Sequence, residues 1–111
     1  MNRSVAKRPL AEIDLIGYYA YLCEYAGTAT AVRFLAAVEK TLELVARSPG
    51  IGGPCEIDNR RLIGLRSIAV SKFKHYLLFY HAFEDRIELV RVLHSARDIQ
   101  GILEAECDDE G

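Results

Sequence analysis

The sequence predicts a single α+β domain, residues 1–111, in which an N-terminal helical hairpin packs on a small, mainly antiparallel sheet. Two long stretches with apolar residues at helical spacing fill the first half of the chain, and three short stretches rich in β-forming residues fill the second. The 111 residues suit one domain, and the 50% that are hydrophobic suffice for one core. Helices laid on one face of a sheet form a stable two-layer arrangement.

The first predicted elements are a short strand over residues 3–7 and a helix that follows it. Pro9 suits the first helical turn because its fixed φ matches that position. Gly27 is expected to end the helix, since glycine readily takes the left-handed cap conformation. Apolar residues at helical spacing predict the side of the helix that faces the core. They are Leu10, Ile13, Ile16, Tyr19 (or Ala20) and Cys23.

The second predicted helix begins at Thr28 or Thr30, because a threonine hydroxyl can cap a helix N-terminus. Pro49 and Gly50 end it. Since only a short turn separates the two helices, they form a hairpin with one apolar side that needs a partner. The apolar stripe of the second helix is regular and consists of Ala31, Phe34, Leu35, Val38, Leu42 and Val45.

The second half of the chain predicts a loop followed by three strands. Residues 48–59 contain two prolines and three glycines, which indicates a loop. Strands are predicted over 62–70, 76–80 and 87–93, with a turn at Glu84 and Asp85. Connections this short favour an antiparallel meander. The strand 76–80 is expected at the centre of the sheet because both of its faces are apolar.

A short closing helix and an acidic tail complete the predicted architecture. Ile99, Ile102 and Leu103 have the spacing of a short helix, and Asp98 is placed to cap it. Residues 104–111 hold five of the 16 acidic residues of the chain. Terminal charge runs of this kind are often disordered, and we expect the same here.

The net charge of −2 hides a basic stretch in the second half of the sequence. Between residues 60 and 97 there are eight Lys or Arg against three Asp or Glu, and all three histidines lie there. A basic surface favours a polyanion or an acidic protein as partner, although a solvated strand face has the same composition. Direct binding of nucleic acid is therefore left open.

Three cysteines, Cys23, Cys55 and Cys107, are too few and too widely spaced for a disulfide framework or a zinc site. No metal or other cofactor is expected. The N-terminus lacks the apolar segment of a signal peptide, and no apolar run approaches the length of a spanning helix. We therefore expect a cytoplasmic protein with no membrane partner.

Six stretches, taken in order, carry a resemblance to a known family. The most specific is the run 91–98, Arg-Val-Leu-His-Ser-Ala-Arg-Asp, in which a strand end, a histidine and an Arg-Asp pair occur together. It resembles the Arg-Val-Leu-His-x-x-Arg-Asp terminus of the ParE/RelE toxin superfamily, ParE branch, and the resemblance extends over about residues 5–103. The other matching stretches are 11–16 (an Ala-x-x-Asp-Leu pattern), 34–38, 48–52, 65–67 and 76–80.

The resemblance implies the toxin of a type II toxin–antitoxin system, of the kind associated with plasmid stabilisation, that a ParD-like antitoxin neutralises by direct binding. The ParE branch is associated with poisoning of DNA gyrase, which implies target binding without chemistry of the toxin's own. Two alternatives remain. One is a RelE-like, ribosome-dependent mRNA endoribonuclease, and the other is an inactive homologue that only binds its antitoxin.

Four residues are candidates for contact with the target: Arg66, Arg91, His94 and Arg97. The last three form a basic cluster at the predicted end of the sheet. A structural interpretation competes with this one, since His94 can be a packed side chain and Arg97 can pair with a carboxylate.

RNA cleavage would need a base, an acid and cations around the phosphate. The candidates for these roles are Arg66, Lys72, His75, His81, Arg91 and His94.

The first predicted helix carries more tyrosines than a small core needs. Tyr18, Tyr21 and Tyr25 lie on a nearly continuous face of it, and Tyr19 lies on the other. Tyrosine is enriched at protein interfaces, so we expect these three side chains to bind the antitoxin. A core with an amphipathic rim would have the same pattern.

Overall fold

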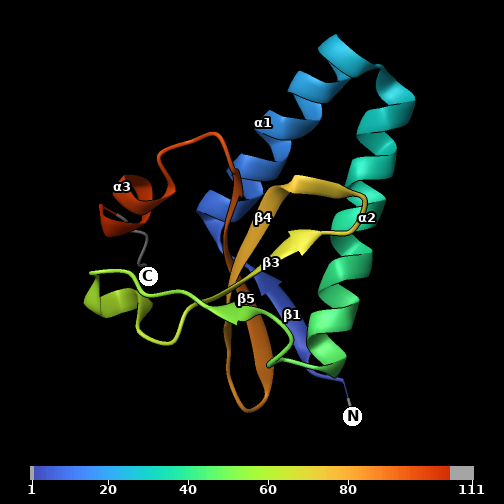
Figure 1. Cartoon of the computed structure of the whole chain (residues 1–111). Coiled ribbons are helices and arrows are strands. Elements are labelled where there is room, and N and C mark those ends of the chain that lie inside the picture. The colour runs from blue at the N-terminus through green and yellow to red at the C-terminus, as the bar shows by residue number, and fades with distance from the viewer. Residues whose placement is uncertain (1, 106–111) are drawn as a thin grey trace.

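Two long helices pack on one face of a five-stranded mixed sheet in the computed structural model, which describes residues 2–105 (Figure 1). The strand order is β1-β5-β4-β3-β2, with β1 parallel to β5 and every other pair antiparallel. The elements are β1 (Ser4–Lys7), α1 (Pro9–Ala26), α2 (Thr28–Arg47), β2 (Gly53–Pro54), the 3-10 helix η1 (Arg60–Leu62), β3 (Arg66–Val70), β4 (Phe73–Ala82), β5 (Arg86–His94) and α3 (Ile99–Glu104).

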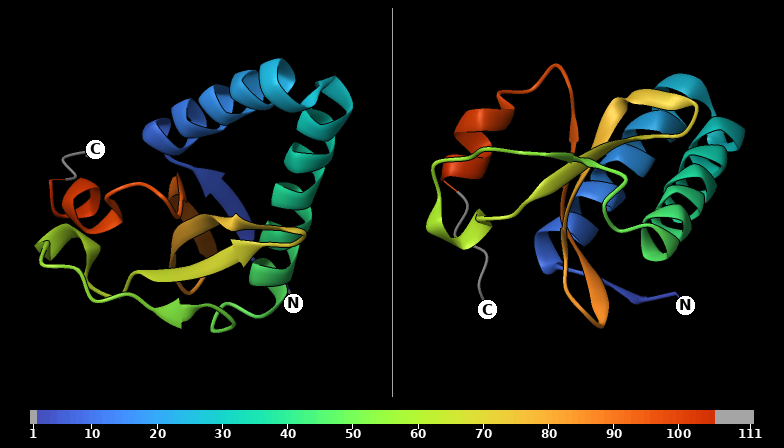
Figure 2. Two further views of the ribbon diagram at one scale, coloured as in Figure 1. Left: turned by 45° about the horizontal axis from the view of Figure 1, so that its top comes forward. Right: turned by 60° about the horizontal axis from the view of Figure 1, so that its bottom comes forward.

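The predicted fold class and the central position of the aromatic strand are confirmed, since β4 lies in the middle of the sheet. Alternation along β4 sends its side chains to two cores. Tyr76 and Leu78 pack with the helices α1 and α2, while Phe79 packs on the other face with residues from η1 and α3. Figure 2 shows α3 and η1 side by side, away from the helical hairpin. Asp98 caps α3 as predicted, because its carboxylate accepts from the Gly101 N–H at 3.1 Å.

The helix α2 buries the stripe that its sequence predicts, but α1 does not. Phe34 and Val38 of α2 are fully buried, whereas Ile13 and Ile16 of α1 are 61% and 70% exposed. The side of α1 that faces the sheet carries Ala11, Asp14, Leu15 and Leu22 instead. The prediction for α1 is confirmed for Tyr19 and Cys23, which pack against the core, and was wrong for Ile13 and Ile16, because this helix has apolar residues on almost every side and apolar spacing does not identify one face.

Three local predictions also differ from the structure. The strand predicted over 62–70 begins only at Arg66, because residues 60–62 form η1. The predicted loop 48–59 contains the two-residue strand β2. No threonine side chain caps α2. Its N-cap is Gly27, whose φ of +97° turns the chain from α1 into α2 within a single residue, a conformation that favours glycine. The predicted tail 104–111 lies mostly outside the described residues.

One buried carboxylate joins α1 to the sheet. Asp14 accepts from Arg91 Nε at 2.8 Å, from the Arg91 terminal nitrogen at 2.9 Å and from the Val92 backbone N–H at 2.9 Å. The side chains of Asp14 and Arg91 are only 7% and 12% exposed. The sheet register shifts at this point, since Phe79 pairs with Arg91 while Tyr80 pairs with Leu89. Such a bulge re-aims side chains, and here it presents Arg91 and the Val92 N–H to the same carboxylate.

We predict that Asp14→Ala lowers the free energy of unfolding by about 3–5 kcal/mol, because it leaves the Arg91 guanidinium buried without its partner. Chemical denaturation measures this effect. Glu12→Ala, at an exposed acid two residues away, is the control and should stay within about 0.5 kcal/mol of wild type. The double variant Asp14→Leu/Arg91→Met should recover part of the loss, since it removes both charges. Equal stability of the Asp14→Ala and Glu12→Ala variants would contradict this role.

Candidate functional site

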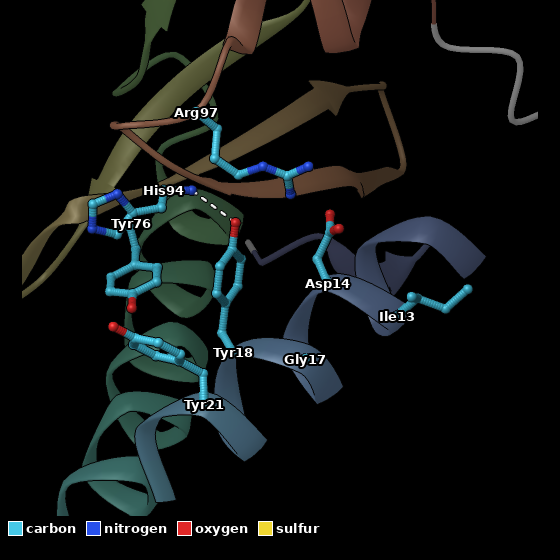
Figure 3. Close-up of a pocket in the computed structure, with 8 residues that line it drawn as sticks. All are labelled: Ile13, Asp14, Gly17, Tyr18, Tyr21, Tyr76, His94 and Arg97. Carbon is cyan, nitrogen blue, oxygen red and sulfur yellow. Dashed lines mark hydrogen bonds between the residues drawn. The ribbon is translucent and has the colours of Figure 1, made fainter. Parts of the chain in front are cut away.

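A surface groove lies where α1 passes the end of the sheet, and it holds several of the residues that the sequence singled out. Its volume is about 460 Å³. Figure 3 shows the helix α1 on one side and residues from β4, β5 and the segment after β5 on the other. The lining residues are Ile13, Asp14, Gly17, Tyr18, Tyr21, Tyr76, His94 and Arg97.

Aromatic rings form one wall of this groove and hold one another in place. The Tyr18 hydroxyl accepts from the His94 backbone N–H at 2.9 Å, and the Tyr18 ring meets Tyr76 edge to face at 5.0 Å between centroids. Tyr76 in turn meets the His94 ring edge to face at 4.9 Å. The His94 ring is fixed further because its Nδ1 accepts from the Ala96 N–H at 3.0 Å. The wall is therefore preorganised for a partner.

Burial raises the pKa of the Tyr76 hydroxyl, and the neighbouring Tyr18 and Tyr21 raise it further. The hydroxyl therefore stays protonated at neutral pH. It provides a polar group within a wall that is otherwise apolar, and tyrosines with one apolar and one polar end are suited to interfaces.

The groove continues along α1 as an exposed apolar ridge. Ile13, Gly17, Tyr21 and Tyr25 follow one another at intervals of four residues, which places them on one side of the helix. Tyr21 and Tyr25 are 54% and 69% exposed, and their rings lie 4.8 Å apart. Of the three predicted antitoxin-binding tyrosines, these two are free to meet a partner, whereas Tyr18 mainly supports the wall.

The predicted target-binding residues do not form one surface. His94 and Arg97 line the groove, and Arg97 is exposed. Figure 3 shows its side chain extending over the groove from the β5 side. Arg91 instead lies beneath the groove in the ion pair with Asp14. Arg66 lies near the other end of the sheet, where its guanidinium donates to the Gly52 and Gly50 carbonyls at 2.8 and 3.1 Å.

The six residues proposed for RNA cleavage are likewise spread over the molecule. Only His75 and His94 lie together, with stacked rings 5.8 Å apart. Lys72 lies in the turn between β3 and β4. His81 is buried near the far end of β4, and Arg66 and Arg91 make the contacts described above. The arrangement therefore does not place cations around the histidine pair.

Comparisons with protein families and with solved structures show what this chain is similar to. The family model described as "ParE toxin of type II toxin-antitoxin system, parDE" matches residues 5–99. The chain belongs to this toxin family. A solved structure described as "Chromosomal ParDE TA system from P. aeruginosa" has the same fold, with a TM-score of 0.70 at 16% sequence identity, covering 83% of this chain and 95% of that chain. No curated protein was found to match the sequence.

Several residues of the toxin's groove were not predicted from the sequence, namely Ile13 as an exposed residue, Asp14, Gly17 and Tyr76. The burial of Asp14 could have been predicted from its position, since an acid among the apolar residues of a helix needs a partner when it is buried. The position of Gly17 becomes apparent only once the side of α1 that faces the sheet is known. Among the described residues of the toxin, no helix is long and apolar enough to cross a membrane.

The pKa of His81 is lowered because burial disfavours the charged ring and because the positive charge of Arg8 lies nearby. A hydrogen bond with the Arg61 backbone and the charge of Glu88 act in the opposite sense and are outweighed. His81 is therefore neutral at neutral pH, and its burial keeps it from acting on a substrate at the surface.

This depressed pKa predicts a loss of stability in mild acid. The unfolded chain has the ordinary histidine pKa of 6.5, so below that pH it binds a proton that the folded toxin resists. The free energy of unfolding should therefore fall as the pH drops through 6.5. The contribution of His81 to this fall ends below the pKa of His81 in the folded toxin. His81→Gln should reduce the difference in the free energy of unfolding between about pH 7.5 and about pH 5.5. His75→Gln, at an exposed position, is the control, and an equal reduction there would contradict the assignment.

Proposed function

We propose that this toxin binds and poisons DNA gyrase in the cytoplasm, and that a ParD-like antitoxin neutralises it by occupying the aromatic groove and the ridge of α1. The observation that carries the proposal is the groove itself. Rigid aromatic side chains beside an exposed arginine are the features of binding hot spots in protein interfaces. Membership of the ParE family supports gyrase as the target, and it supports an antitoxin as the partner.

The proposal makes target binding, without chemistry of the toxin's own, the basis of toxicity. Arg66 and Arg91 are engaged with the protein's own carbonyls and carboxylate, and His81 is buried. Of the three that remain, Lys72 lies in the turn between β3 and β4, and the stacked pair of His75 and His94 is the one observation that favours the RelE-like alternative, since two imidazoles provide an acid and a base. Arg97 is then the residue of the groove that we assign to the target, because its charge is exposed at the groove edge.

We predict that the purified toxin inhibits gyrase supercoiling with accumulation of cleaved DNA, and that Arg97→Ala weakens the inhibition about tenfold, the effect of losing one charge-assisted contact of about 1.4 kcal/mol. Arg47→Ala, an exposed arginine at the end of α2, is the matched control and should act as wild type does. Cleaved mRNA in a translation extract, with supercoiling untouched, would instead favour the nuclease. Neither activity would favour an inactive homologue.

A separate prediction tests the antitoxin surface. Tyr21→Asp/Tyr25→Asp should weaken antitoxin binding by about 100-fold or more, because it places two charges where aromatic anchors would be buried. Both side chains are exposed, so the toxin should keep its wild-type melting temperature. Ile63→Asp, at a 78% exposed apolar residue far from the ridge, is the control. Isothermal titration with the cognate antitoxin measures the affinities, and unchanged binding by the tyrosine variant would exclude this surface.

A further inference from the structure

A second groove lies on the other side of the helical hairpin, between α2 and the turn that joins β3 to β4. Figures 1 and 2 both show the tip of this β-hairpin beside α2. The groove has a volume of about 490 Å³. Arg33 and Lys40 of α2 and Lys72 of the turn line it, and no acidic residue does.

Within the described part of the protein, none of these three cations has its charge paired, although Arg33 donates to the neutral Thr30 hydroxyl at 3.1 Å. For residues 2–105, the structure records no ion pair for Arg33, Lys40 or Lys72, and all three are exposed. Glu39, the acid next to Lys40 in α2, forms an ion pair with Lys7 instead, with 3.1 Å between Glu39 Oε2 and Lys7 Nζ. A hollow lined by positive charges alone concentrates anions, so the groove is an electrostatic site for a polyanion.

The backbone at Lys72 supports the same conclusion. With a φ of +68°, Lys72 is the one non-glycine residue of residues 2–105 in the left-handed region. Glycine or asparagine adopts this conformation more readily than lysine does. The toxin therefore keeps a cation at the edge of the groove at a position where the backbone favours another residue.

We propose that this groove binds the phosphate backbone of duplex DNA. Arg33 and Lys40 are two helical turns apart, about 10 Å along α2. Measured along the duplex axis, on which each strand carries one charge about every 3.4 Å, this separation spans about three phosphates of one strand. Lys72 then reaches the backbone from the opposite side of the groove.

The floor of the groove distinguishes duplex DNA from other anions. It consists of Ala36, Ala37 and Phe73, and the Phe73 ring packs against the buried Phe34 at 5.4 Å. Single-stranded RNA or DNA is held by several exposed aromatic faces on which bases stack, whereas the lining of this groove has one aromatic ring, Phe73, which is half-buried against Phe34. An acidic protein helix would need apolar pockets for its anchors, and alanine methyl groups do not form them. Contacts to phosphates alone fit this surface.

The experiment measures binding of the full chain to a fluorescent duplex of mixed sequence by anisotropy, at several salt concentrations and without gyrase. We expect a dissociation constant of about 10⁻⁶ to 10⁻⁴ M that weakens steeply with salt. Lys40→Ala/Lys72→Gly should bind about tenfold more weakly and reduce the slope of log K against log salt by about two, since each lost phosphate contact removes about 0.9. The glycine suits the positive φ, so the variant should fold.

Arg47→Ala/Arg60→Ala removes the same charge from exposed positions outside the groove and should bind as wild type does. Several results would overturn the proposal. One is no binding of the duplex by wild type, and another is an equal loss in both variants. A third is tighter binding of a single-stranded RNA or of a polyglutamate peptide than of the duplex, with the same sensitivity to Lys40 and Lys72. Because gyrase is absent from the assay, its outcome is independent of the proposed target.

Discussion

The carboxylate of Asp14 is the contact on which the arrangement of this toxin depends. It ties the first turns of α1 to two consecutive residues of β5, and it supplies a partner for a guanidinium and a backbone N–H that are both buried. The groove lies beside this joint, which holds its two walls together with the hydrogen bond from the His94 N–H to the Tyr18 hydroxyl. An apolar contact would bury similar area without fixing direction, whereas two parallel N–H···O bonds set the orientation of α1.

The position of the groove suggests how one partner can block another. The exposed ridge, with Tyr21 and Tyr25, adjoins the lining of the groove, where Arg97 lies at the edge. A bound antitoxin that covers the ridge would also exclude a second protein from the arginine. Neutralisation then requires only steric exclusion, with no change in the toxin's shape. The groove beside Lys72 lies on the far side of α2, so such a complex would leave it accessible.

The sequence predicted the layers of the fold correctly, and it failed where tertiary contacts decide. The stripe of α2 was readable because the other side of that helix is polar, while α1 is apolar almost all round, so that Ile13 and Ile16 were assigned to the core although they are exposed. The motif 91–98 identified the family, yet the bulge that turns Arg91 inward depends on sheet register, which no local pattern records. The burial of His81 also depends on packing from distant elements. His94 and Arg97 were found because they lie three positions apart in the same motif.

The pairing of β1 with β5 also determines when the sheet can be completed during synthesis. Ser4 lies opposite Arg86, so β1 cannot pair until a strand more than 80 positions further along the chain has been synthesised. The hairpin of α1 and α2 involves only local contacts and can form early. The groove needs His94 and Arg97, and it therefore forms only after synthesis has passed residue 97. The groove is therefore absent from any shorter nascent chain, even one in which the helical hairpin has already formed.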